Sequence, residues 1–128
     1  MPWNLTSDRP IYAQLIEKLQ LDIITGHYKP GEKLPSVRDL ASEASVNPNT
    51  MQKALSELER SGLVYAQRTS GRFITDDQEL IKNTRNELAR MQIRDFIRTM
   101  RQFDLDDDEI LHLIQEIMKE EIEWTNLW

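Results

Sequence analysis

Cysteine is absent from the 128 residues of this chain. Its absence excludes disulfide bonds, thiolate metal ligands and thiol-based catalysis, and it fits a reducing compartment. No apolar run approaches the roughly 20 residues that a helix needs to cross a bilayer. The chain also does not open with a basic segment followed by a short apolar one, as secretory signals do. We therefore expect a soluble, cytoplasmic protein without a membrane partner.

Catalytic and cofactor motifs are missing as well. The sequence contains no nucleophile elbow, no P-loop and no glycine-rich dinucleotide loop. His27 and His112 have no carboxylates at the spacing of a zinc motif. The acidic run at 104–109 lacks the glycine and the ligand spacing of a calcium loop, which favours a helix-capping turn. We expect no enzymatic activity, no cofactor and no bound metal.

The net charge of −6 argues at first against a nucleic-acid partner. The charge is distributed unevenly, however. Residues 1–76 carry nine basic and nine acidic side chains, whereas residues 77–128 carry seven and 13. The acidic excess therefore belongs to the C-terminal part, and the N-terminal part is free to present a local basic face to DNA. The alternative on charge alone is a neutral domain with an acidic helical tail.

Periodicity and punctuating residues predict a mainly α-helical chain with one small β-hairpin. Ser36 is placed to cap one short helix, and Asn47, followed by Pro48, to cap the next, which ends at Gly62. Two helices joined by a tight turn and followed by a hairpin predict a winged helix-turn-helix domain at 1–76, and a two-helix arm then forms a second domain at 77–128. The expected elements are helices at about 9–25, 37–44 and 48–61, strands at 63–68 and 73–75 around a turn at 69–72, and helices at 78–103 and from about 107 onward.

The start of the third helix carries the chemistry that reads DNA. In a helix-turn-helix, the N-terminal residues of the second helix of the motif reach base edges in the major groove. Asn and Gln side chains pair with adenine, and Thr contacts thymine. The N-terminal end of this helix, at Asn47, carries a partial positive charge that suits a phosphate. Ordinary capping and a solvated helix surface are the alternative. The candidate contacts here are Asn47, Asn49, Thr50, Gln52 and Lys53.

Basic side chains flank this helix on both sides in the sequence. An arginine one turn into the preceding helix suits a phosphate or a guanine edge, and arginines on a small hairpin suit the minor groove or phosphates. The alternative for the hairpin is an exposed turn with solubilising charges. The additional candidates are Ser36 and Arg38 before the turn, and Arg68, Ser70, Gly71 and Arg72 on the hairpin.

Three spaced motifs in this chain resemble the GntR family of bacterial transcription regulators. They are PIYAQL from Pro10, PGEKLPSVRDLA from Pro30 and VNPNTMQKALSELERSGLV from Val46. The resemblance implies that Arg38, the start of the third helix and the tip of the hairpin contact DNA. The hairpin departs from the usual Gly-x-Gly-Thr of the family, since it has Thr-Ser-Gly-Arg from Thr69.

The short C-terminal part resembles the YtrA-type branch of that family. For this branch the resemblance implies a homodimer held by the C-terminal helices, a roughly palindromic double-stranded operator and repression, often of a transporter operon. A helical cap on a monomer and a protein-interaction module are the alternatives, and the sequence identifies no small-molecule effector. The candidate dimer contacts are Leu88, Phe96, Met100, Ile110, Ile114, Ile117 and Met118.

Overall fold

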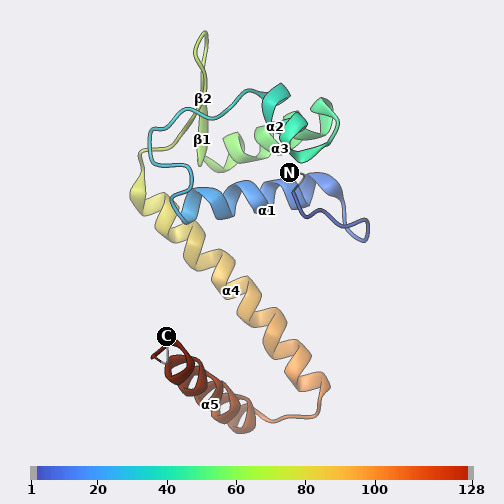
Figure 1. The fold of residues 1–128 in the computed structure, drawn as a ribbon, viewed down its shortest axis with the longest axis vertical. Coiled ribbons are helices and arrows are strands. Elements are labelled where there is room, and N and C mark those ends of the chain that lie inside the picture. Colours follow the sequence, from blue (N-terminus) through green and yellow to red (C-terminus); the bar gives the residue numbers. More distant parts are fainter. Residues whose placement is uncertain (1–2, 127–128) are drawn as a thin grey trace. The chain divides into compact units, whose positions relative to one another are not determined.

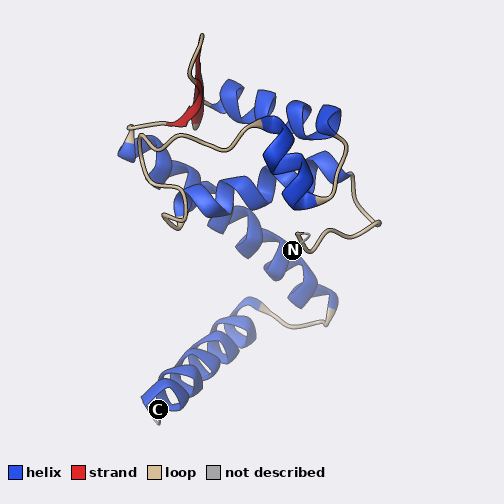
Figure 2. Cartoon of the chain, turned by 45° about the horizontal axis from the view of Figure 1, so that its top comes forward, coloured by secondary structure: helices blue, strands red, loops and turns tan. Residues whose placement is uncertain are grey.

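A computed structural model describes the chain over residues 3–126 (Figure 1). Within this range the chain forms five helices and one two-stranded antiparallel sheet (Figure 2). The predicted fold class, mainly α-helical with a small hairpin, is confirmed. The elements are α1 (Ile11–Ile24), α2 (Val37–Ala44), α3 (Pro48–Ser61), β1 (Val64–Gln67), β2 (Gly71–Ile74), α4 (Gln78–Gln102) and α5 (Asp107–Asn126).

Short-range capping bonds fix the ends of α2 and α3, as the sequence predicts. The Ser36 hydroxyl accepts a hydrogen bond from the Asp39 backbone N–H at 3.1 Å, and the Asn47 side chain accepts one from the Asn49 N–H at 2.7 Å. Each bond satisfies a backbone donor that the first turn of a helix leaves free. Between the helices Ser45 has a left-handed φ of 58°, which turns the chain sharply.

The hairpin differs from the prediction at the start of its second strand. Strand β2 begins at Gly71, which pairs with Gln67, so the turn between the strands is shorter than the predicted 69–72. Gly71 adopts a φ of 101°, which a residue with a side chain rarely does. The segment before α2 also joins the sheet, because Lys33 forms an isolated bridge with Phe73. The predicted loop therefore braces the hairpin.

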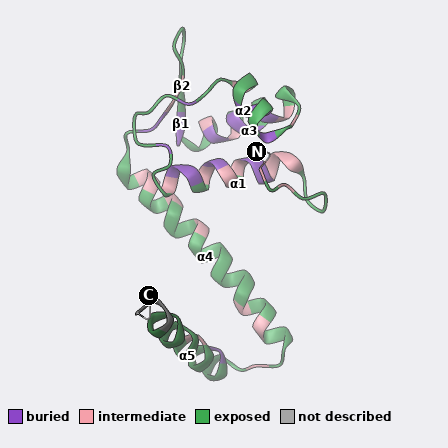
Figure 3. Ribbon diagram, viewed as in Figure 1, coloured by how far each residue is buried: buried purple, intermediate pink, exposed green. Residues whose placement is uncertain are grey.

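The core lies between the first three helices and the base of the hairpin. Apolar side chains of α1, α2 and α3 are buried, and the first turn of α4 adds the half-buried Leu80 and Ile81. Figure 3 marks buried residues of these three helices in purple. Burial of each large apolar side chain stabilises the fold by about 1.5–3 kcal/mol. The largest fully buried side chains are Leu15, Leu19, Ile23, Leu40, Met51, Leu55, Leu58, Leu63, Val64 and Ile74.

The chain divides into two compact units between Asn86 and Glu87, within α4. The domain boundary predicted from the sequence, between residues 76 and 77, lies just before the first residue of α4. This predicted boundary stays a prediction. In the second unit α5 begins with a reciprocal capping box, because the backbone N–H groups of Asp106 and Glu109 each donate to the other residue's carboxylate, at 3.1 and 2.8 Å. In the part of the chain that the structure describes, no helix is long and apolar enough to cross a membrane.

Candidate nucleic-acid interface

Helix α3 has one buried face and one polar exposed face. Met51, Ala54, Leu55 and Leu58 are buried in the core. The predicted contacts Asn49, Gln52 and Lys53 are exposed, and Thr50 is half-buried. Gln52 makes one long hydrogen bond, from its amide nitrogen to the Ser56 hydroxyl at 3.3 Å, so most of its amide is free to pair. The exposed face therefore offers amide and ammonium groups to a ligand.

Lys53 is held against an aromatic ring of another helix. Its ammonium nitrogen lies 3.9 Å from the centre of the Tyr12 ring on α1. A cation over the face of an aromatic ring is attracted by the ring's negative charge density, and the N–H donors of the ammonium that point away from the ring stay able to bind other groups. The role of Tyr12 could not be predicted from the PIYAQL motif, because no local sequence pattern indicates which residue of another helix faces its ring.

An open groove of about 620 Å³ runs between the start of α2 and the tip of the hairpin. Lys33, Ser36 and Ser70 are among its lining residues, and Arg38 is exposed on the adjoining first turn of α2. The Ser36 hydroxyl accepts the capping bond of α2, which leaves it free to act as a donor. The groove thus brings the predicted Ser36 together with Ser70, Gly71 and Arg72 of the hairpin, whereas Arg38 and Arg68 do not line it. It adds Lys33, which sequence reasoning missed because its bridge to Phe73 is non-local.

The two arginines of the hairpin have different surroundings. Arg68 and the neighbouring Thr69 and Ser70 are exposed at the tip. Arg72, by contrast, forms an ion pair with Glu59 of α3, and its side chain is only 20 % exposed. This pair ties the hairpin to α3. The pair uses only Nε of the guanidinium, and the structure does not test a contact of its terminal nitrogens with DNA, so the assignment of Arg72 as a contact stays a prediction.

Gly71 lies close to the hydrocarbon chain of Lys33. A β-carbon at this position would lie 3.2 Å from Lys33 Cε, closer than ordinary van der Waals contact. The positive φ explains why glycine stands at the first position of β2, since the flexible Lys33 side chain could move away from a β-carbon. The backbone at the tip of the hairpin therefore turns at Gly71, next to the side chain of Lys33.

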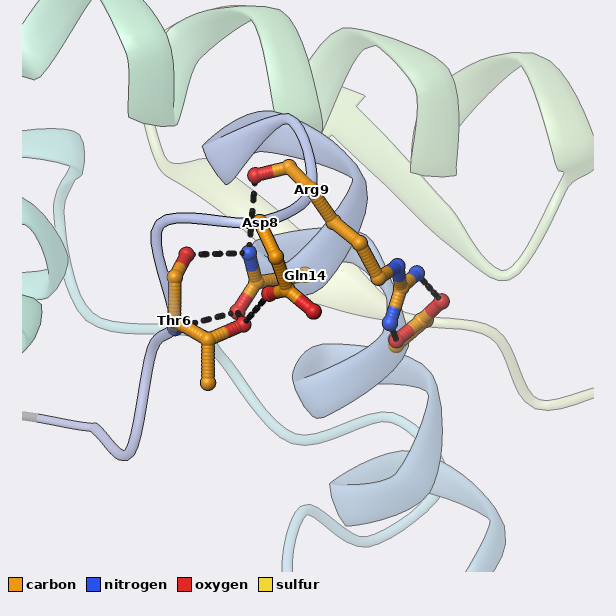
Figure 4. A network of polar contacts seen from close by, with 5 residues as sticks. Thr6, Asp8, Arg9 and Gln14 are labelled. Atoms are coloured by element: carbon orange, nitrogen blue, oxygen red, sulfur yellow. Dashed lines mark hydrogen bonds and ion pairs between the residues drawn. The ribbon is translucent and has the colours of Figure 1, made fainter.

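The segment before α1 is attached to the fold by the buried side chain of Gln14 (Figure 4). The Gln14 carbonyl oxygen accepts from the Thr6 N–H at 2.8 Å, and its amide nitrogen donates to the Thr6 and Arg9 carbonyls at 2.8 and 3.0 Å. The Thr6 hydroxyl also donates to Asp8, and this hydrogen bond lowers the pKa of the Asp8 carboxyl below its ordinary value. Sequence reasoning missed this anchor, although Gln14 belongs to the PIYAQL motif.

The anchored segment lies beside the start of α3. Trp3 and Leu5 are packed against the core, and together with Asn47 and Thr50 they line an open groove of about 440 Å³. The N-terminal segment therefore supports the turn from which the exposed face of α3 begins.

Comparison with known proteins identifies this arrangement. Residues 11–74 match the model of the bacterial regulatory proteins of the gntR family. The chain belongs to this family. Its members are DNA-binding transcription regulators rather than enzymes, so the expected absence of enzymatic activity agrees with the family.

Two relatives from Bacillus subtilis bear on the branch of the gntR family. The chain is 36 % identical to the uncharacterized HTH-type transcriptional regulator YhcF over 85 % of this chain and 90 % of that protein. It is 45 % identical to the HTH-type transcriptional repressor YtrA over 56 % of this chain and 55 % of that protein. The predicted resemblance to YtrA is thereby confirmed.

Solved structures of gntR regulators agree with this assignment. A GntR family transcriptional regulator from Listeria monocytogenes matches with a TM-score of 0.82 and 33 % identity, over 88 % of this chain and 98 % of that one. The DNA-binding domain of AraR, solved with its operator ORX1, matches with a TM-score of 0.51 and 29 % identity, over 59 % of this chain and 92 % of that one.

Proposed function

We propose that this gntR-family regulator is a homodimeric repressor that reads a roughly palindromic operator with the start of α3. The observation that carries the proposal is the exposed polar face of α3, where Asn49, Gln52 and Lys53 project from a helix whose opposite side is buried. A helix of this kind fits the major groove, which is wide enough to admit it. The match to the AraR domain, which was solved with an operator, supports this reading.

Each residue of this face has a distinct role in the proposal. Gln52 and Asn49 pair with adenine through their carbonyl and amide groups, and Thr50 contacts a thymine methyl group. Lys53 neutralises a phosphate while its ammonium nitrogen stays over the Tyr12 ring. Asn47 caps the N-terminal end of α3, and the partial positive charge of this helix end attracts a phosphate.

The groove between α2 and the hairpin supports a second set of contacts, to the DNA backbone. Lys33 lines this groove. Arg38 and Arg68 are exposed and are sequence neighbours of its lining residues. Ser36 and Ser70 line the groove and add hydroxyl donors, and Gly71 lines it without a side chain. Phosphate contacts of this kind set register and affinity rather than sequence preference.

The exposed apolar side chains of the second unit support the homodimer. Among its described residues only Ile110 is a buried hydrophobic one. Of the predicted dimer contacts, Phe96, Ile117 and Met118 are 42, 54 and 63 % exposed, while Leu88, Met100 and Ile114 are half-buried. Exposed apolar surface of this extent is typical of an interaction site, and a second copy would remove it from water.

The remaining parts of the proposal rest on the family resemblance. We infer that the protein acts in the cytoplasm, that residues 1–76 form the DNA-binding domain and residues 77–128 the dimerisation domain, and that the target is a transporter-type operon. An unidentified small-molecule effector would release the operator.

Fluorescence anisotropy with the duplex just upstream of the protein's own gene tests the proposal, with a scrambled duplex as control. We expect tight binding to the native duplex only, with two chains bound per site. We also expect log affinity to fall steeply with log salt concentration, because bound phosphates release counterions. Weak binding of both duplexes without a salt dependence would instead support the protein-interaction module.

A further inference from the structure

The part of α4 that lies in the second unit carries a line of arginines. Arg90, Arg94, Arg98 and Arg101 follow one another at intervals of four, four and three residues, so they lie on one side of the helix. All four are exposed. We call these residues the arginine stripe.

Helix α5 carries a matching line of glutamates. Glu109, Glu116, Glu120 and Glu123 are spaced by seven, four and three residues, which also puts them on one side of their helix. They are exposed as well. We call these residues the glutamate stripe. It extends over about 21 Å and the arginine stripe over about 16 Å, at 1.5 Å per residue, so the two lines have comparable lengths.

Each stripe borders an apolar edge of its own helix. Ile97 lies three residues after Arg94 and four before Arg101, and Leu113 lies four residues after Glu109 and three before Glu116. Leu113 is 41 % exposed and Ile97 is half-buried. Charged lines that flank an apolar seam are the arrangement by which packed helices select their partner.

Within one chain the two stripes scarcely meet. Helices α4 and α5 make hardly any contact with each other. Arg98 pairs with Asp95 at 2.7 Å and Arg101 with Asp107 at 3.1 Å, and neither acid belongs to the glutamate stripe. His112 faces Glu116 at 2.8 Å.

Among the described residues, five of the eight charges in the stripes lack an opposite charge, and one of these five, Glu109, instead accepts the Asp106 backbone N–H. Among the residues that the structure describes, no carboxylate pairs with Arg90 or Arg94, and no cation pairs with Glu120 or Glu123. These four side chains are the ones that a second molecule is free to engage.

We infer that the arginine stripe of α4 pairs with the glutamate stripe of α5 in a second copy of this chain. The arrangement is reciprocal, so two-fold symmetry forms it twice in one dimer. Like charges oppose the pairing of α4 with α4 or of α5 with α5 along these lines. The inference rests on the proposed homodimer and adds which helix faces which, and therefore which chains are accepted as partners.

Two charge-reversed variants of the full chain test the inference, Arg90→Glu/Arg94→Glu on α4 and Glu120→Arg/Glu123→Arg on α5. Neither removes an ion pair found within the chain. Each variant alone brings like charges together at both copies of the contact, so we expect its dimer Kd to rise about tenfold or more. A 1:1 mixture restores opposite charges at both copies, so we expect a mixed dimer with a Kd within about threefold of the unchanged protein.

Sedimentation velocity measures the dimer Kd, and native mass spectrometry identifies the mixed dimer. Lys82→Glu/Arg85→Glu is the matched control, since it reverses two charges on α4 outside the stripe and should leave the Kd unchanged. Circular dichroism establishes that each variant folds. If a charge-reversed variant loses helix, the neutral variants Arg90→Gln/Arg94→Gln and Glu120→Gln/Glu123→Gln take its place. We expect the dimer Kd of each neutral variant to depend less on salt concentration than that of the unchanged protein.

Each result decides between the two proposals. An unchanged protein that sediments as a monomer overturns the homodimer and the stripe pairing together. An unchanged dimer whose variants also dimerise normally overturns the pairing but leaves the homodimer standing. Folded variants that stay monomeric in the mixture would mean that the stripes act within one chain, and this also overturns the inference.

Discussion

The ammonium nitrogen of Lys53 on α3 lies 3.9 Å from the centre of the Tyr12 ring on α1. A side chain proposed to bind phosphate is thereby held by a helix that makes no proposed DNA contact. Because Tyr12 restricts the lysine before DNA arrives, less conformational entropy is lost on binding.

Tyr12→Leu is expected to weaken operator binding by up to about fivefold, because a contact of about 0.5–1 kcal/mol sets the upper limit on how strongly the ring restricts the lysine before binding. Tyr12→Phe keeps the ring and should bind like the unchanged protein. Anisotropy titrations measure both variants. In a Lys53→Ala background, Tyr12→Leu should have no further effect, and an equal loss in both backgrounds would contradict the positioning role.

Gln52 and Arg38 are expected to differ in what they contribute to binding. Gln52→Ala should reduce the preference for the native over the scrambled duplex by about 1–3 kcal/mol, because a bidentate base contact is lost. Arg38→Ala should weaken binding to both duplexes alike. It should also lower the slope of log affinity against log salt concentration by about one unit, because one phosphate contact is lost.

Both side chains are exposed, so neither variant should lose helix by circular dichroism. Loss of helix in either variant would assign that residue to the fold instead of the interface. If both variants weakened binding to the native and the scrambled duplex by similar factors, the division between a base contact of Gln52 and a phosphate contact of Arg38 would be contradicted.

Arg72 and Glu59 form an ion pair between the hairpin and α3, with side chains 20 and 32 % exposed. Arg72→Ala and Glu59→Ala should each lower the free energy of unfolding by about 1 kcal/mol or less. The double variant should lose less than the sum of the two. Urea unfolding of all four proteins measures this coupling energy.

Operator binding by the same proteins tests the direct role of Arg72. If the pair only fixes the hairpin, the two single variants should weaken binding equally. A much larger loss with Arg72→Ala than with Glu59→Ala would show that the arginine itself reaches the DNA.

Gln14→Ala is expected to lower the free energy of unfolding by about 1–3 kcal/mol, because it leaves backbone groups of Thr6 and Arg9 without their partner. Urea unfolding followed by circular dichroism measures the loss. Gln20→Ala, which changes a glutamine elsewhere on α1, is the matched control and should have little effect. Equal losses in the two variants would mean that Gln14 does not anchor the N-terminal segment.

Ile117→Asp/Met118→Asp is expected to break the proposed dimer, since a carboxylate in an apolar interface loses its hydration without a partner. Both side chains are more than half exposed in the single chain, so the variant should keep its helix content. Light scattering measures the molecular mass. Two chains per particle in this variant would exclude these residues from the interface.

The sequence alone determined the features whose chemistry is local. The capping side chains of α2 and α3 lie within three residues of the N–H groups that they bind, so Ser36 and Asn47 could be assigned from spacing. The buried and exposed sides of α3 follow from helical periodicity. The three motifs with their order indicated the gntR family, which the match over 11–74 shows.

Contacts between groups far apart in the sequence could be assigned only from the folded chain. Lys53 faces Tyr12, Arg72 faces Glu59 and Gln14 holds Thr6 because separate segments fold against each other, and no spacing along the chain encodes those distances. The start of β2 at Gly71 also depended on non-local pairing, since Lys33 bridges to the same strand. Local propensity thus specified the elements, while packing of the shared core specified the neighbours of each polar side chain.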